Sequence, residues 1–325
     1  MLDQLIDDKK QSYSIVSLDQ LIAQNELDRY LFLFLITKEN EQNLSPRTIH
    51  DYKQKISRFT SWTKKKVIAE ITREDIQIYL HELRKTCKPV SVLGYFTNLR
   101  VWFNWLVDND YLDKSPMAKM QKPKVTVEIV EPLRIKDIEK MLLVCSTNDF
   151  MAVRNRLIIL MLLDTGLRLS ELASIKLDDI DPGRHIIKIL GKGAKERVVA
   201  IGVKAYAALA RYVAARLDRL DRLKRKNIDY LFISDECRRL TPWGIYIAIK
   251  TIASRAGVEG RCHPHKFRHT SGTMALLNGA SEREVQLMLG HSTPLMTKRY
   301  TATIDSMFAA KKHRIFSPVD RLLKK

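Results

Sequence analysis

The spacing of apolar positions divides the chain into helical segments. In residues 27–112 these positions recur every three or four residues, which predicts an all-helical region. One helix is expected to begin at Ser45-Pro46, because serine caps helix N-termini and proline suits the first turn. Trp102 and Trp105 lie at helical spacing and are expected in a core. The predicted helices of this region are Leu27–Lys38, Ser45 to about Lys64, Arg73–Lys85 and Val90–Asn109.

Residues 113–130 interrupt this pattern. They contain Pro116, Pro123 and several lysines without helical periodicity, which is typical of a linker. Residues 1–26 are polar with scattered apolar positions, and we interpret them as an N-terminal extension with a short helix at Ser17–Asn25. Two folded regions are therefore expected, one on each side of the linker.

After the linker the pattern is helical except at one point. Within His185–Ile201, the runs HIIKIL and RVVAI favour two β-strands joined by a basic, glycine-containing tip at Gly191–Lys195. Ser281 and Glu284 have the spacing of a capping box at a helix start. Further helices are predicted at Ile135–Cys145, Met151–Asp164, Arg168–Ile175, Val203–Lys226, Thr241–Ala256, His263–Asn278, Ser281–Leu289 and Ile304–Lys312. The predicted fold is mainly α with a small β-sheet, an α+β class.

The chain is strongly basic. Its formal net charge of +19 indicates a polyanionic partner, most often nucleic acid. Residues 1–112 hold 16 Lys and Arg against 15 Asp and Glu, whereas residues 113–325 hold 40 against 22. The second part is therefore expected to supply most of the attraction. A basic surface that only keeps the protein soluble is the alternative, because charge reports on association and not on fold.

The composition disfavours several classes of protein. The longest apolar run, Leu157–Leu163, is far shorter than the roughly 20 residues that cross a bilayer. Met1–Lys10 lacks the basic start and apolar run of a signal peptide, so we expect a cytoplasmic protein without a membrane partner. The sequence has no CxxC pair, so a zinc cluster is not expected. We expect reduced thiols with packing roles at the four cysteines, which are Cys87, Cys145, Cys237 and Cys262.

Four short segments carry candidate chemistry. They are TGLRLSEL (165–172), GKGAKERVV (191–199), HKFRH (265–269) and LGHS (289–292), with Tyr300 nine residues after His291. His265 and Arg268 are three apart on a predicted helix and share a face. Arginines fork onto phosphate oxygens, histidine transfers protons near neutral pH, and a tyrosine hydroxyl is a covalent nucleophile. Together they would suit a phosphodiester without any metal or other cofactor.

Each segment alone has an ordinary structural interpretation. An arginine after a turn is usually a surface or ion-pair residue, and a lone histidine is usually a structural hydrogen-bonding group. Tyr300 alone would be taken for half-buried core. The hairpin tip alone would be a solvated turn, and it lacks the glycine spacing and the GK[ST] ending of a P-loop. A phosphodiester site is supported by the occurrence of all four segments in this order.

In this order the segments resemble the tyrosine recombinase, or phage integrase, family, which includes the Xer-type recombinases. The resemblance runs from about residue 27 to the C-terminus. It implies a helical core-binding (SAM-like) DNA-binding domain at 27–112, a linker at 113–130, and a catalytic domain with a C-terminal tail at 131–325. The positions that match the family's catalytic residues are Arg168, Lys192, His265, Arg268, His291 and Tyr300.

The resemblance also implies a reaction. The two arginines and the later histidine of this set would hold the scissile phosphate while Tyr300 attacks phosphorus and forms a 3′-phosphotyrosine. Lys192 would protonate the leaving 5′-oxygen, and His265 would accept the tyrosine proton. The 5′-hydroxyl of a second strand would then release the tyrosine. The energy of the phosphoester bond is kept, so no ATP would be required.

Several neighbouring residues each have two interpretations. Glu171 either orients an active-site group or forms a plain ion pair within its helix. Lys195 and Arg197 either contact phosphate or are solvated, and Lys195 is the alternative to Lys192 as the acid. His269 is expected to form a structural hydrogen bond. A basic face of the N-terminal region either contacts DNA phosphates or is simply solvated, and it consists of Arg47, Lys53, Lys55, Arg58 and Lys64–Lys66.

The family resemblance further implies assembly on DNA. A homo-tetramer, or a hetero-tetramer with a related recombinase, would act on two double-stranded recombination sites. The tail Ile304–Lys325 would dock on a neighbouring protomer or on its own, with Met307, Phe308 and Ile315 as the candidate contacts. The N-terminal extension favours a mobile element, while integration, transposition and chromosome-dimer resolution all stay open.

Three other functions compete with a recombinase. A type IB topoisomerase-like enzyme would share the chemistry but relax supercoils without exchanging partners. A non-catalytic DNA-binding regulator could retain the fold, although such a protein would be expected to lack some of the catalytic residues. A metal-dependent transposase would need clustered carboxylates to hold two metal ions, and the sequence contains no convincing set.

Overall fold

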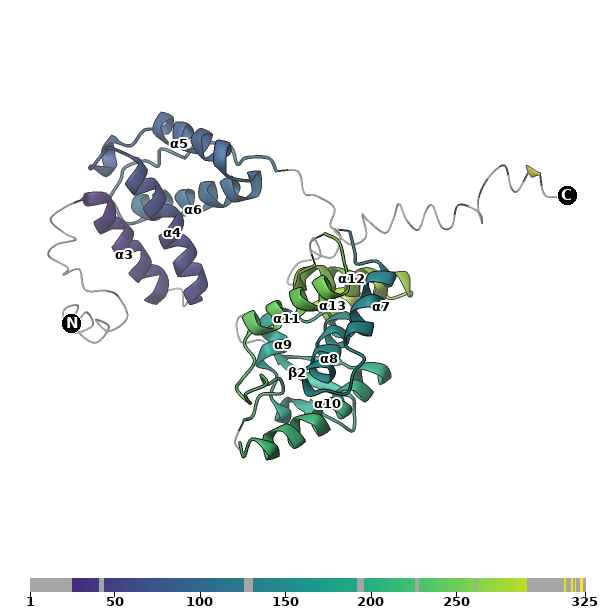
Figure 1. The fold of residues 1–325 in the computed structure, drawn as a ribbon. Coiled ribbons are helices and arrows are strands. Elements are labelled where there is room, and N and C mark those ends of the chain that lie inside the picture. Colours follow the sequence, from purple (N-terminus) through teal and green to yellow (C-terminus); the bar gives the residue numbers. More distant parts are fainter. Residues whose placement is uncertain are drawn as a thin grey trace. The chain divides into compact units, whose positions relative to one another are not determined.

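The computed structural model describes residues 25–40, 44–125, 131–191, 196–225, 228–260 and 262–290, with five single positions near the C-terminus. The chain divides into two compact units, Met1–Val127 and Glu128–Lys325 (Figure 1). Within the described residues, the first unit is helical and the second is helical with one small sheet. The prediction of a mainly α fold with a small β-sheet is confirmed.

The part of the first unit that the structure describes contains four helices and a short 3-10 turn. The hydroxyl of Ser45 accepts a hydrogen bond from the amide of Thr48, so the predicted helix start is confirmed. The next long helix begins with a capping box between Thr72 and Asp75. The elements are α3 (Glu26–Asn40), α4 (Pro46–Trp62), the 3-10 turn η1 (Ile68–Glu70), α5 (Arg73–Thr86) and α6 (Pro89–Asp108).

Aromatic side chains fill the core of the first unit. Phe34 on α3, Phe59 on α4 and Trp102 on α6 are fully buried, and Trp105 is nearly so. Phe34 meets Trp105 edge to face at a centroid distance of 5.5 Å, a favourable geometry for aromatic pairs. The expectation that both tryptophans belong to the core is confirmed.

The segment that follows α6 packs differently from the predicted linker. Met117 and Met120 are buried in the core of the first unit, and Arg100 on α6 donates a hydrogen bond to the Met120 carbonyl. Unbranched methionine side chains can reach into irregular gaps from a chain without helical periodicity, which hides this packing from a periodicity search. Residues 113–120 therefore belong to the first unit.

The second unit contains seven helices and three strands within the described residues. Their order is α7 (Ile135–Val144), α8 (Phe150–Thr165), α9 (Leu169–Ser174), the 3-10 turn η2 (Leu177–Asp179), β1 (Ile180–Asp181), β2 (Ile186–Leu190), β3 (Glu196–Ala200), α10 (Val203–Arg222), α11 (Pro242–Arg255), α12 (Pro264–Leu277) and α13 (Glu282–Leu289). The predicted helices between Ile135 and Leu289 and the capping box between Ser281 and Glu284 are confirmed, with ends shifted by a few residues.

Helix α8 is the centre of this unit. It packs against α7, α10, α11 and α12, and Leu157, Ile158, Ile159 and Leu162 are completely buried (Figure 1). A helix that is apolar on every side is one that other helices surround. No helix in the described part of the chain is long and apolar enough to cross a membrane.

The predicted hairpin is present as an antiparallel sheet in the order β1-β2-β3. Ile187 pairs with Val199 and Ile189 with Arg197, which places Arg197 in the middle of the β2–β3 ladder. The two-residue strand β1 was not predicted, because Ile180–Asp181 is too short to show an alternating pattern. The hairpin tip, residues 192–195, lies outside the described residues, as do the predicted helices at Ser17–Asn25 and Ile304–Lys312.

A buried arginine fixes the irregular segment after α10. Arg216 is 2% exposed and donates to the carbonyls of Ile228, Tyr230 and Leu231 at 2.5 to 3.2 Å. We expect Arg216→Met to lower the free energy of unfolding by about 3 kcal/mol, because buried carbonyls would lose their donor. Denaturant unfolding of the full chain measures this change.

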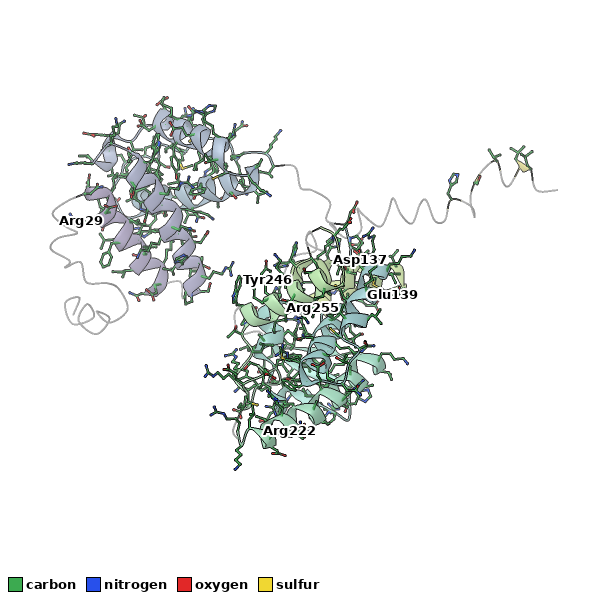
Figure 2. All side chains as sticks on the ribbon, viewed as in Figure 1. Arg29, Asp137, Glu139, Arg222, Tyr246 and Arg255 are labelled. Atoms are coloured by element: carbon green, nitrogen blue, oxygen red, sulfur yellow. The ribbon has the colours of Figure 1, made fainter. Side chains whose placement is uncertain are left out.

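Arg222 provides the matched control, since it lies on the same helix with a side chain that is 70% exposed (Figure 2). Arg222→Met is expected to change the free energy of unfolding by less than about 0.5 kcal/mol. Equal unfolding midpoints for the two variants would show that Arg216 does not stabilise this segment.

Candidate active site

Arg168 is positioned by a sharp turn between two helices. Helix α8 ends at Gly166, which has the left-handed conformation (φ 60°), and Arg168 is the N-cap of α9. A Cβ at Gly166 would lie 2.3 Å from Cδ2 of Leu289, so a larger residue would displace the end of α13. The glycine of TGLR thus brings the end of α13 close to Arg168.

Arg268 joins this turn to the end of α13. Its side chain on α12 is 4% exposed and donates from Nη1 to the Gly166 carbonyl at 2.6 Å. Its Nη2 donates to the Leu289 carbonyl at 2.5 Å. A planar guanidinium with five fixed donors can hold two such carbonyls at once, which a lysine ammonium does less well.

Arg168 approaches the same helix end from the other side. Its Nη2 lies 3.4 Å from the Gly290 carbonyl, and its side chain is 32% exposed. Both guanidinium groups therefore contact the last residues before His291. This histidine, Lys192 and Tyr300 lie outside the described residues, so the structure brings together Arg168, Arg268 and the backbone that leads to His291.

His265 lies one turn before Arg268 on α12 and remains accessible to solvent. Partial burial and the positive charges of Arg268 and Arg168 hold its pKa below the usual value of 6.5. Because the pKa is lowered, the imidazole is neutral at pH 7 and can accept a proton.

Glu171 is buried between two arginines. Its carboxylate accepts hydrogen bonds from the backbone and side chain of Arg168, both at 2.8 Å, and from both terminal nitrogens of Arg197 at 2.9 and 3.0 Å. Burial alone would raise the pKa of Glu171, but the hydrogen bonds from Arg197 and Arg168 lower it to about 2. The carboxylate is ionised at neutral pH and orients both guanidinium groups.

Arg197 does not have the solvated position that a surface phosphate contact would have. Its side chain on β3 is 16% exposed, and its two terminal nitrogens are committed to Glu171. The sequence interpretation as a DNA contact did not foresee this, because Glu171 is 26 residues away along the chain. Lys195 lies outside the described residues.

His269 and the cysteines have structural positions. His269 is 8% exposed, and its Nδ1 lies 3.2 Å from the hydroxyl of Thr273, as expected for a structural hydrogen bond. Burial raises the pKa of the Cys262 thiol to about 11, which keeps it protonated and unreactive. Among the described residues, no group of three His, Cys, Asp or Glu side chains could hold a metal ion.

The candidate DNA-binding residues of the first unit fall into two groups. Arg47 and Lys53 on α4 are exposed. Lys55 instead forms an ion pair with Asp51 at 2.6 Å, and Arg58 donates to the Tyr95 hydroxyl at 3.0 Å. Lys65, in the basic run after α4, is paired with Asp75. Arg58, Lys64 and Lys66 are exposed as well, so most of this predicted basic face is accessible to solvent.

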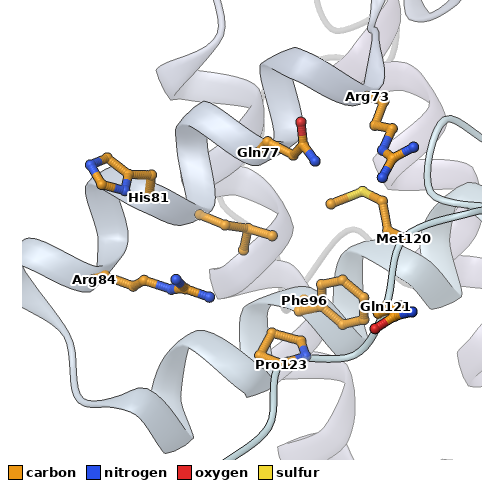
Figure 3. Close-up of a pocket in the computed structure, with 9 residues that line it drawn as sticks. Arg73, Gln77, His81, Arg84, Phe96, Met120, Gln121 and Pro123 are labelled. Carbon is orange, nitrogen blue, oxygen red and sulfur yellow. The ribbon is translucent and has the colours of Figure 1, made fainter.

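Sequence reasoning missed a pocket in the first unit. It has a volume of about 420 Å³ and lies between α5, α6 and the segment that follows Met120 (Figure 3). Arg73, His81 and Arg84 project from α5 around a floor that includes Phe96. His81 and Arg84 follow Arg73 by eight and eleven residues along one helix face, a signal that a search for basic stripes could have found.

Comparison with known proteins places these features in a family context. Residues 131–307 match the phage integrase family, and residues 31–113 match the N-terminal SAM-like domain of phage integrases. The tyrosine recombinase XerD of Listeria monocytogenes is 33% identical over 284 residues, which cover 85% of this chain and 94% of the relative. The tyrosine recombinase XerC of Listeria innocua is 32% identical over 273 residues, which cover 82% and 91%.

A solved structure supports the same fold. The crystal structure of a lambda integrase dimer bound to a COC′ core site matches with a TM-score of 0.67 and 16% identity. The match covers 83% of this chain and 93% of that one. At this identity the likeness concerns the fold alone.

Proposed function

This chain belongs to the phage integrase family of site-specific tyrosine recombinases, and we propose that it cleaves and rejoins DNA strands through a covalent bond to Tyr300. The single observation that carries this proposal is the convergence of two guanidinium groups. Arg268 holds the Leu289 carbonyl and Arg168 lies beside the Gly290 carbonyl, immediately before His291. In this proposal Arg168, Arg268 and His291 face one phosphate and stabilise its negative charge.

The proposed first step exchanges one phosphoester bond for another. The Tyr300 hydroxyl oxygen attacks phosphorus, the bond to the 5′-oxygen breaks, and a 3′-phosphotyrosine remains. His265 accepts the phenol proton, which its lowered pKa permits at neutral pH. Lys192 donates a proton to the leaving 5′-oxygen.

In this scheme the cations act on the transition state. Arg168, Arg268 and His291 neutralise the charge that develops on the non-bridging oxygens. The reverse attack by a 5′-hydroxyl of another strand then restores the phosphodiester and releases Tyr300. Since one phosphoester bond is replaced by another of similar energy, the cycle consumes no ATP. The charge stabilisation that a metal would otherwise provide comes from Arg168, Arg268 and His291.

The two units have separate roles in the proposal. We assign the helical region 27–112 to DNA binding, with exposed basic residues such as Arg47 and Arg58 as phosphate contacts, and 131–325 to catalysis. A duplex site is the substrate, and four protomers, identical or mixed with a related recombinase, act on two sites. A DNA substrate also implies a cytoplasmic location.

Strand exchange between two sites tests this function. We expect purified protein to recombine a plasmid that carries two copies of the site flanking the encoding locus, and to do so in the presence of EDTA. Exchange of flanking markers is scored by gel electrophoresis. Relaxation of supercoils without marker exchange would favour a type IB topoisomerase-like enzyme, and binding without any covalent adduct would favour a non-catalytic regulator.

A further inference from the structure

Arg197 connects three elements, each of which adjoins a residue of the proposed active site in the sequence. It lies on β3, directly after the hairpin tip that contains Lys192. Through Glu171 it is linked to α9 and Arg168, since the carboxylate binds both guanidinium groups. A bidentate pair of this kind fixes geometry more tightly than a single ionic contact.

The third element is the C-terminal end of α13. A Cβ at Gly290 would lie 2.9 Å from Nε, 3.0 Å from Cζ and 3.1 Å from Cδ of Arg197. The guanidinium therefore lies directly against the Gly290 backbone, which has the left-handed conformation (φ 63°) and leads to His291. Only a glycine leaves room for Arg197 in this position.

The remaining nitrogen of Arg197 is also informative. Nε is buried and has no hydrogen-bond partner among the described residues. Both terminal nitrogens donate to the Glu171 carboxylate, whose negative charge neutralises the guanidinium and opposes the approach of a phosphate. The unpaired Nε costs folding free energy, because it is a buried donor without a partner. The bidentate pair with Glu171 fixes the orientation of the guanidinium in return.

We propose that Arg197 is a positioning residue that holds the hairpin strand, Arg168 and the backbone before His291 in register for phosphate transfer, and that it does not itself bind DNA. The proposal rests on the proposed function. It predicts that loss of Arg197 slows the chemical step while DNA affinity is kept. A phosphate contact would behave in the opposite way.

The first test uses Arg197→Gln and Arg197→Lys with a nicked duplex that traps the covalent adduct. The duplex carries the cleavage site mapped with wild-type protein on DNA that flanks the encoding locus. At saturating protein, Arg197→Gln is expected to form the adduct roughly 100-fold more slowly, the scale associated with a misplacement of about 1 Å. Arg197→Lys should recover part of the rate, because it keeps the charge but loses the fork.

DNA affinity separates the two roles of Arg197. For a positioning residue, the dissociation constant and its salt dependence stay close to wild type. If instead affinity falls, the salt slope decreases by about one, and adduct formation at saturation is unchanged, Arg197 contacts phosphate and the proposal fails.

A second test uses two glycines with the same backbone conformation. Gly290→Ala would push a methyl group against Arg197, whereas Gly257, with φ 60° at the end of α11, has nothing within 4 Å of its Cβ position. Both substitutions carry similar backbone strain. Adduct formation should therefore slow at least tenfold more in Gly290→Ala than in Gly257→Ala.

Equal rates for the two alanine variants would overturn the proposal. So would an Arg197→Gln defect that disappears once the folded fraction, from thermal melting with the same DNA present, is taken into account. A failure of the proposed function gives a different result, because wild-type protein would then form no adduct at all.

Discussion

Replacing Tyr300 with phenylalanine should abolish the covalent protein–DNA adduct and leave DNA affinity close to wild type. The phenyl ring keeps its volume but loses the oxygen that attacks phosphorus. The expected loss in cleavage rate is on the order of a million-fold, the scale seen when a hydrolase loses its nucleophile. A nicked duplex and denaturing gel electrophoresis detect the adduct, and electrophoretic mobility shifts measure affinity.

A second tyrosine provides the control for this variant. Tyr111 lies in the first unit, where its ring contacts Tyr30 at a centroid distance of 4.7 Å. Tyr111→Phe should form the adduct at the wild-type rate. An adduct that persists in Tyr300→Phe, or that peptide mapping assigns to another residue, would refute the assignment of the nucleophile.

Arg268→Ala should lower both the cleavage rate and the stability of the second unit. Loss of one phosphate-binding donor raises the barrier by about 3 kcal/mol, or more than 100-fold in rate. The carbonyls of Gly166 and Leu289 would also lose a buried donor, at roughly 1 to 3 kcal/mol each. Adduct formation at saturating protein and denaturant unfolding of the same preparation measure the two effects.

Two further variants separate chemistry from folding. Arg268→Lys keeps the charge but cannot hold both carbonyls in a planar fork, so it should restore part of the rate and little of the stability. Arg255 on α11 is exposed, and Arg255→Ala should change neither quantity (Figure 2). If Arg268→Ala cleaved at the wild-type rate after correction for unfolded protein, Arg268 would be purely structural.

The two arginines differ in how far their roles depend on neighbours. Arg268 is almost fully buried and has carbonyl partners on both sides, so its position is independent of Glu171. Arg168 is a third exposed and relies on Glu171, whose carboxylate is shared with Arg197. Substitution of Glu171 or Arg197 should therefore displace the guanidinium of Arg168 more than that of Arg268.

The sequence was sufficient for the order and type of the helices and the β2–β3 hairpin around the site, although not for the short strand β1. Apolar periodicity located the helices, because each buries a face whose spacing follows the helical turn. The capping residue Ser45 and the box between Ser281 and Glu284 located helix starts, since local hydrogen bonds determine them. The β-rich runs near the basic tip located the hairpin, because strand preference is also local.

The same local reasoning could not reach contacts between distant segments. Met117 and Met120 were assigned to a linker, yet they complete the core of the first unit. Arg197 was considered a phosphate contact, yet its terminal nitrogens bind Glu171. Both contacts form only when elements that are distant in the sequence pack against each other. No spacing in the sequence indicates that the two methionines meet the core or that Arg197 meets Glu171.

The amino-acid sequence by itself determined which chemical groups the protein carries, in which order, and on which local elements. Family membership follows from that order. Only the tertiary structure decided that Arg168 and Arg268 both contact the end of α13, across 122 and 21 residues of chain. The physical reason is that backbone carbonyls and glycine clearances have no side-chain signature, so their role becomes visible only when the packed helices bring them within hydrogen-bond distance of the guanidinium groups.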